Sequence, residues 1–206
     1  MPMRTRAAAF AALTVAALAA ATAFTAPAGA APKNAAEPAF LDASELPPHP
    51  SSAWTAGPVS DGFPAELAHC LGEGVPAYDY RHRVFRTELD TGAVQVTVVT
   101  GSPAKGEALA ARLNEEIRSC ADRIEESDPE IRAEGRSYGS LPVEEGAQVH
   151  GLHTTTSWGA TDIHLLSVGR DGRTVTVVGW GQMGDFDDAP VAAFRQTTTT
   201  AVDKLH

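Results

Sequence analysis

A serine between two glycines is the first pattern in this chain that could support chemistry. Gly135-Arg136-Ser137-Tyr138-Gly139 has the Gly-x-Ser-x-Gly spacing of a nucleophile elbow, and Asp162 and His164 follow it in the chain order of a hydrolase triad. An elbow needs an apolar strand before the serine and a helix after it, whereas charged residues precede this serine and Leu141-Pro142 follows it. We therefore interpret the motif as a glycine-flanked bend at a strand end, and keep an extracellular hydrolase using Ser137 as an alternative.

Three histidines raise the alternative of a metal site. His150 and His153 are three residues apart, so on a strand they would point to opposite faces and could not chelate together. His153 could lie across from His164 with Asp162 nearby, and two histidines with a carboxylate suit zinc. The acidic run Asp185–Asp188 lacks the glycine and glutamate of an EF-hand loop and is better interpreted as a helix cap. A packed, hydrogen-bonded histidine is the commoner outcome, so we predict neither a metal nor a cofactor and keep His153, His164 and Asp162 as candidates.

Aromatic side chains in the expected strands suggest ligand binding instead. Tyr138, Trp158 and Trp180 each combine an apolar ring with a polar tip, a combination that favours apolar grooves. Aromatic residues in strands are more often part of a core, which is the competing interpretation.

The first thirty residues have the pattern of a secretory signal peptide. Arg4 and Arg6 precede an alanine-rich apolar run over residues 7–24, and Ala28-Gly29-Ala30 is a small-x-small cleavage pattern. An uncleaved anchor is the alternative, but alanine is weakly apolar and no other segment could span a membrane. We therefore expect residues 1–30 to be a signal peptide, residues 31–38 a flexible linker and residues 39–206 a single secreted domain, released outside the cell or kept in the wall.

The charge of the expected mature chain excludes several classes of partner. Loss of Arg4 and Arg6 with the leader changes the formal net charge from −10 to −12. Nucleic acids and anionic lipid surfaces attract basic proteins, so the charge argues against both, and we expect no nucleic-acid partner. Separately, we expect a monomer.

The only two cysteines are predicted to form a disulfide bond. Cys70 and Cys120 would both be in an oxidising compartment after export, and the Cys-x-x-Cys spacing of a redox pair is absent. Closing a loop of this length stabilises the fold by about 4 kcal/mol in the chain-entropy description. Buried free thiols are the alternative.

Alternating apolar residues predict two hairpins. The first has arms over residues 81–89 and 93–100, and a two-residue Thr91-Gly92 loop would pair Leu89 with Val94 and Phe85 with Val98. The second has arms over residues 162–169 and 173–181. There, a two-residue Asp171-Gly172 turn would pair Val168 with Val175. Two further strands are expected within residues 131–138 and 148–157.

Helical periodicity predicts one long helix and one terminal helix. The long helix begins at the Ser102-Pro103 cap and ends at Ser127-Asp128-Pro129, with Cys120 on its apolar stripe. The terminal helix covers residues 190–205, with Asp187 or Asp188 as its cap. A short helix is expected over residues 64–71, and a helical turn near residues 42–46 within a Pro-rich extended arm over residues 31–62. These elements predict an α+β fold: an antiparallel sheet of about six strands with the two main helices packed on one side.

The order of these features resembles a known family. Phe40-Leu41-Asp42 leads to Trp54, Cys70-Leu71 ends a short helix, a hairpin precedes the helix that carries Cys120, and residues 168–175 enter an apolar strand before a terminal helix. This arrangement resembles the PknH-like extracellular sensor domains of actinobacteria over about residues 39–205. The resemblance implies an antiparallel sheet flanked by helices, with a cleft for an unidentified ligand. Those domains carry two disulfides, whereas this chain can form one, and no functional residue is carried over.

These observations favour a secreted, non-enzymatic binding domain. Its expected ligand is an apolar small molecule or a component of the cell envelope. An extracellular hydrolase and a protein-interaction or inhibitor module are the alternatives.

Overall fold

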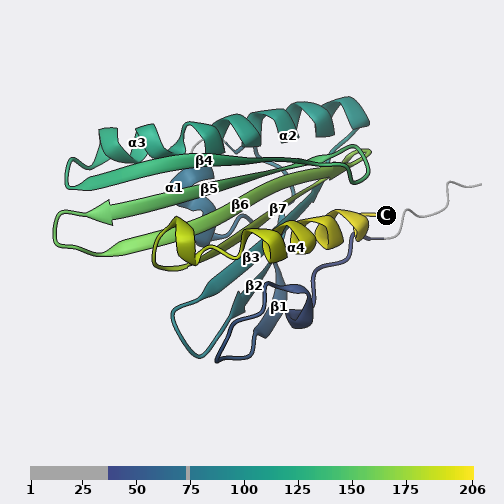
Figure 1. Cartoon of the computed structure of the whole chain (residues 1–206). Helices are drawn as coiled ribbons and strands as arrows, with labels where there is room; N and C mark the ends of the chain where they lie inside the picture. Colours follow the sequence, from purple (N-terminus) through teal and green to yellow (C-terminus); the bar gives the residue numbers. More distant parts are fainter. Residues whose placement is uncertain (1–36, 73–74) are drawn as a thin grey trace, which may run out of the picture. The chain divides into compact units, whose positions relative to one another are not determined.

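A single open antiparallel sheet of seven strands organises the described part of the chain, in the order β1-β2-β3-β7-β6-β5-β4 (Figure 1). The structure, a computed structural model, describes residues 37–72 and 75–206, so the expected signal peptide and most of the expected linker lie outside the described residues. The strands are β1 (Thr55–Asp61), β2 (Arg81–Arg86), β3 (Gly92–Val99), β4 (Ile131–Leu141), β5 (Ala147–Thr156), β6 (Thr161–Asp171) and β7 (Thr174–Met183). The helices are α1 (Ala68–Leu71), α2 (Pro103–Arg118), α3 (Cys120–Ser127) and α4 (Val191–Asp203), with 3-10 helices η1 (Ala43–Glu45), η2 (Ala65–Leu67) and η3 (Phe186–Asp188).

The α+β class is confirmed, but the prediction that both main helices lie on one side is wrong. Figure 1 shows α2 and α3 along one face of the sheet and α4 along the other. Val175 and Val177 of β7 pack in the core with α2, whereas Val178 and Trp180 pack in the core with α4. The central strands therefore bury both faces, and each face requires its own helical layer. We call these the α2 face and the α4 face.

The seventh strand is β1, which the sequence interpretation assigned to the extended arm. It contains Gly57 and Pro58, two residues that disfavour a central strand. An edge position tolerates them, because one side of an edge strand needs no ladder hydrogen bonds. The pairing with β2 also shifts between Ala56 and Val59, which is a local irregularity around the proline.

Both hairpins form, but each has a different register from the prediction. In the first, Val84 lies opposite Val94 and a five-residue loop over residues 87–91 joins the strands. The odd shift places Phe85 on the α4 face, away from Val94. In the second, Val168 pairs with Val177, so Gly172-Arg173 forms the turn instead of Asp171-Gly172. This even shift keeps every side chain on its predicted face.

The predicted long helix is divided into α2 and α3 at Ser119. Ser102 caps the start of α2, where its hydroxyl accepts a hydrogen bond from the backbone N–H of Lys105. Ser119 donates its hydroxyl hydrogen to the Glu115 carbonyl, which competes with regular helix hydrogen bonding and accompanies the break. The predicted terminal helix begins at Val191 after Pro190. Asp187 and Asp188 do not cap it, because they belong to η3.

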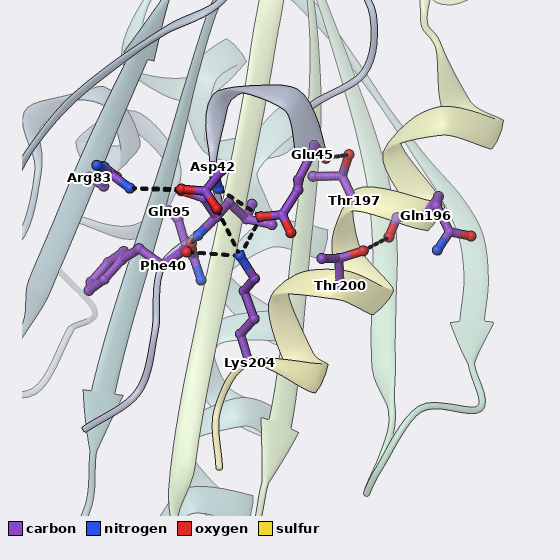
Figure 2. A network of polar contacts seen from close by, with 10 residues as sticks. Phe40, Asp42, Glu45, Arg83, Gln95, Gln196, Thr197, Thr200 and Lys204 are labelled. Carbon is purple, nitrogen blue, oxygen red and sulfur yellow. Dashed lines mark hydrogen bonds and ion pairs between the residues drawn. The ribbon is translucent and has the colours of Figure 1, made fainter. Parts of the chain in front are cut away.

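The segment around η1 is fixed to α4 by a network of polar contacts (Figure 2). The ammonium group of Lys204 donates a hydrogen bond to the Phe40 carbonyl at 3.2 Å and also pairs with the carboxylates of Asp42 and Glu45. The Leu41 N–H donates to the buried side chain of Gln95 at 2.7 Å. These contacts hold in place a segment whose Leu41 and Leu46 are buried members of the α4-face core.

The predicted disulfide bond between Cys70 and Cys120 is confirmed, and it joins α1 to α3 with a Cα–Cα distance of 5.1 Å. None of the helices in the described part of the chain combines the length and the hydropathy needed to span a membrane.

Candidate functional site

An open cavity of about 310 Å³ lies on the α2 face, between the η2–α1 segment and strands β2, β3, β6 and β7. Its apolar lining comes from the sheet and from η2, and includes Leu67, Val84, Val94 and Leu166. Met183, which is 61% exposed, also lines it and gives it an apolar rim. This combination of an apolar lining with a few polar side chains is typical of small-molecule sites.

Two glycines of β7 determine how closely side chains approach the sheet in this cavity. A Cβ atom on Gly179 would lie 2.8 Å from Cδ2 of Leu67, and one on Gly181 would lie 2.6 Å from Nδ1 of His164. The side chains of Leu67 and His164 therefore occupy the space that a residue larger than glycine at position 179 or 181 would need. Glycine in a strand interior is unfavourable by itself, so its presence here reflects close approach.

Two imidazole rings form the polar part of the cavity. His69 of α1 and His164 of β6 face one another with ring centroids 5.2 Å apart. His164 is half-buried, and this desolvation, with a smaller contribution from His69, lowers its pKa to about 4. The pKa of His69 is also lowered, mainly by desolvation, although its ring is more exposed. Both imidazoles are therefore neutral at neutral pH, and each offers one hydrogen-bond donor and one acceptor.

Charged side chains around the cavity are mostly acidic. In the described part of the chain, Glu66, Asp90 and Asp162 line it together with a single guanidinium group, that of Arg86. Arg86 donates a hydrogen bond to the Glu66 carboxylate at 2.9 Å, so one of the three carboxylates is neutralised. The rim therefore carries an excess of negative charge.

The disulfide bond holds the helical wall of the cavity in place. Cys70 directly follows His69, and its bond to Cys120 attaches α1 to the start of α3. The guanidinium group of Arg123 strengthens this attachment, because it contacts the carbonyls of Cys70 and Glu116. The position of His69 thus depends on a covalent link outside the cavity.

The residues proposed for zinc binding do not come together. His153 pairs with Ile163 in the β5–β6 ladder, whereas His164 pairs with Leu152, so the two histidines lie on opposite faces of the sheet. The ring of His153 packs 5.5 Å from that of Phe186, and its buried Nε2 has no hydrogen-bond partner among the described residues. Of the other two zinc candidates, His153 and Asp162, only Asp162 lines the cavity together with His164. Within residues 37–72 and 75–206, no group of three or more potential ligands could hold a metal ion.

Ser137 lies within the edge strand β4 and not at a strand-to-helix elbow. It is exposed and precedes an irregularity between Ser137 and Ser140 in the pairing with β5. His150 is its cross-strand neighbour, and the Nε2 of this buried histidine lies 2.9 Å from Oδ1 of Asn114. Burial, with a smaller effect from Arg118, lowers the pKa of His150 to about 4. No hydrogen bond between the described residues joins Ser137 to His150.

The three aromatic residues predicted to bind a ligand do not form one groove. Trp158 is 68% exposed in the turn between β5 and β6. Trp180 is buried on the α4 face, and Tyr138 packs against the same core from β4, which is separated from β7 by two strands. Of the three, only Trp180 lines the cavity of the α2 face.

Sequence interpretation missed His69, Gly179 and Gly181. His69 is next to Cys70, so the predicted disulfide was a signal that this histidine is held in a fixed position. Glycines on either side of Trp180 in an apolar strand were a second signal, because such glycines indicate close approach.

A comparison with models of protein families gives no match, and neither does a comparison with curated proteins.

Proposed function

We propose that this protein is a secreted, non-enzymatic binding domain that takes up an apolar small molecule or an apolar part of a cell-envelope component in the cavity of the α2 face. The observation that carries the proposal is an open apolar cavity, lined by Leu67, Val94 and Leu166, in which two neutral imidazoles provide the polar contacts. Such a site can bury an apolar molecule and fix its orientation through one or two hydrogen bonds.

Secretion is part of the proposal. The leader pattern of residues 1–30 supports it, and the disulfide bond is typical of proteins in oxidising compartments. The resemblance to PknH-like sensor domains supports a ligand-binding role, because it implies a cleft for an unidentified ligand.

Native mass spectrometry of protein purified from the culture medium tests the proposal. We expect a mass increment that remains under gentle ionisation and is lost when the protein is unfolded. Protein that never carries an increment and binds no apolar probe such as octanol would overturn the proposal.

Gly179→Ala is the informative variant for this test. The added methyl group would push the end of Leu67 into the cavity and should weaken binding at least tenfold. Gly135→Ala is its matched control, because a Cβ atom there would contact only Ala121 at 3.8 Å. Equal binding by both variants and the parent protein would show that the ligand binds elsewhere.

Hydrolysis at Ser137 is a second candidate function, favoured by its cross-strand pairing with His150, which Asn114 orients. Turnover of a panel of esters that disappears in Ser137→Ala would support this function, and turnover equal in both proteins would exclude it.

A further inference from the structure

The charges around the cavity indicate which apolar ligands it can accept. Asp90 and Asp162 line the cavity, and no cation among the described residues forms an ion pair with either carboxylate. Among the described residues, Arg86 is the one cation of the lining, and it is already paired with Glu66. A negatively charged ligand would therefore approach two uncompensated negative charges and one engaged guanidinium group. Like charges placed together reduce affinity and select against such ligands.

The described residues in the interior of the cavity offer no compensation for a negative charge. Leu67 and Leu166 provide apolar surface, and His69 and His164 provide hydrogen bonds without charge when they are neutral. An anion that enters loses its hydration, which is costly unless a counter-charge replaces it. An alcohol or an amide avoids this penalty and can still form a hydrogen bond with an imidazole nitrogen. An ammonium group is also costly to desolvate, but the carboxylates of Asp90 and Asp162 can act as its counter-charges.

We propose that the cavity selects apolar ligands whose polar end carries no negative charge, and that it rejects the corresponding anions. This inference rests on the proposed function, since it concerns the same cavity. It identifies the ligand class as neutral or cationic amphiphiles, and it excludes fatty-acid-like anions of the same size.

Octanol and octanoate are matched probes for this inference, because they share a chain length and differ in the charge of the head group. We would titrate the full secreted protein with each by calorimetry at pH 7.5 and low salt. Octanol should bind at least tenfold more tightly than octanoate. Equal binding, or tighter binding of octanoate, would overturn the inference and leave the proposed function intact. Absence of binding by both probes would overturn the proposed function and the inference together.

A charge-neutralising variant tests whether the carboxylates cause the selection. D90N/D162N should bind octanoate about fivefold more tightly than the parent protein, so its preference for octanol over octanoate should decrease. D203N is the control, because Asp203 is exposed at the end of α4, on the other face of the sheet. The inference would be overturned if the ratio of the octanol affinity to the octanoate affinity is the same in D90N/D162N, D203N and the parent protein. Circular dichroism of each variant confirms that the compared proteins are folded.

Discussion

Cys70 of α1 is joined covalently to Cys120, the first residue of α3, and this bond attaches the wall of the cavity to the helical layer of the α2 face. The two cysteines are 50 residues apart in sequence, so the crosslink closes a long loop that includes β2 and β3. In the chain-entropy description, removing it costs about 4 kcal/mol. C70A/C120A should therefore lower the free energy of unfolding by roughly 2–4 kcal/mol in urea titrations.

Dithiothreitol provides the control for the disulfide prediction. It should destabilise the parent protein to a similar degree and leave C70A/C120A unchanged. A parent protein whose unfolding midpoint is the same with and without reductant would contradict the prediction.

Buried neutral histidines should make the protein less stable in acid. The pKa values of His150 and His164 are lowered to about 4 in the folded protein, compared with about 6.5 in the unfolded chain. Between these values the unfolded state binds protons that the folded state does not, so stability is full above pH 6.5 and is lost as the pH falls toward 4. Each histidine should contribute a slope of up to about 1.4 kcal/mol per pH unit in this range.

Carboxylates also titrate in acid, so the histidine contribution must be isolated with a variant. H150N/H164Q should show a shallower decrease in unfolding free energy between pH 6.5 and pH 4 than the parent protein. H49Q/H82Q is the control, since His49 and His82 neither line the cavity nor contact Asn114, and it should keep the parent slope. Parallel pH profiles for the parent protein and H150N/H164Q would refute the prediction.

The sequence predicted the identity of the elements better than their registers and faces. Period-2 alternation specifies a register only where one face of a strand is buried and the other is exposed. In β2 that condition fails, because Val84 packs against the α2-face core and Phe85 is buried in the α4-face core. The loop is instead fixed by Thr87, whose N–H and hydroxyl both donate to the Thr91 carbonyl at 3.1 Å.

The same limitation explains why the position of α4 was predicted incorrectly. Val175 and Val177 alternate with Thr174 and Thr176, which suggests one apolar face, but Val178 and Trp180 place apolar side chains on the other face of the same strand. A strand that is apolar on both faces requires cover on both faces. The residues that line the cavity escaped prediction for a different reason. His69 and His164 are 95 residues apart, and they approach only because α1 packs on the face of the sheet that carries the His164 side chain.

Lys204 should make a measurable contribution to stability through the segment around η1. Its ammonium group contacts the Phe40 carbonyl and two carboxylates while being only partly exposed, so its hydrogen bonds are stronger than those of a surface pair. Lys204→Met should lower the free energy of unfolding by about 1–2 kcal/mol and increase proteolytic cleavage within residues 37–50. Lys105→Met, at an exposed position of α2, should change neither quantity. Cleavage of this segment at the parent rate in Lys204→Met would contradict the role assigned to the network.

Gly169 and Gly135 are both strand glycines, but their environments predict opposite tolerance for a methyl group. A Cβ atom on Gly169 would lie 2.2 Å from Cγ2 of Val202 in α4 and 3.1 Å from Cβ of Ala147. Gly169→Ala should therefore force α4 away from the sheet and lower the free energy of unfolding by about 1–3 kcal/mol. At Gly135 the nearest atom would be Cβ of Ala121 at 3.8 Å, an ordinary contact, so Gly135→Ala should be neutral or slightly stabilising. Urea unfolding of the two variants measures this difference, and equal midpoints would show that α4 does not pack against Gly169 as closely as described.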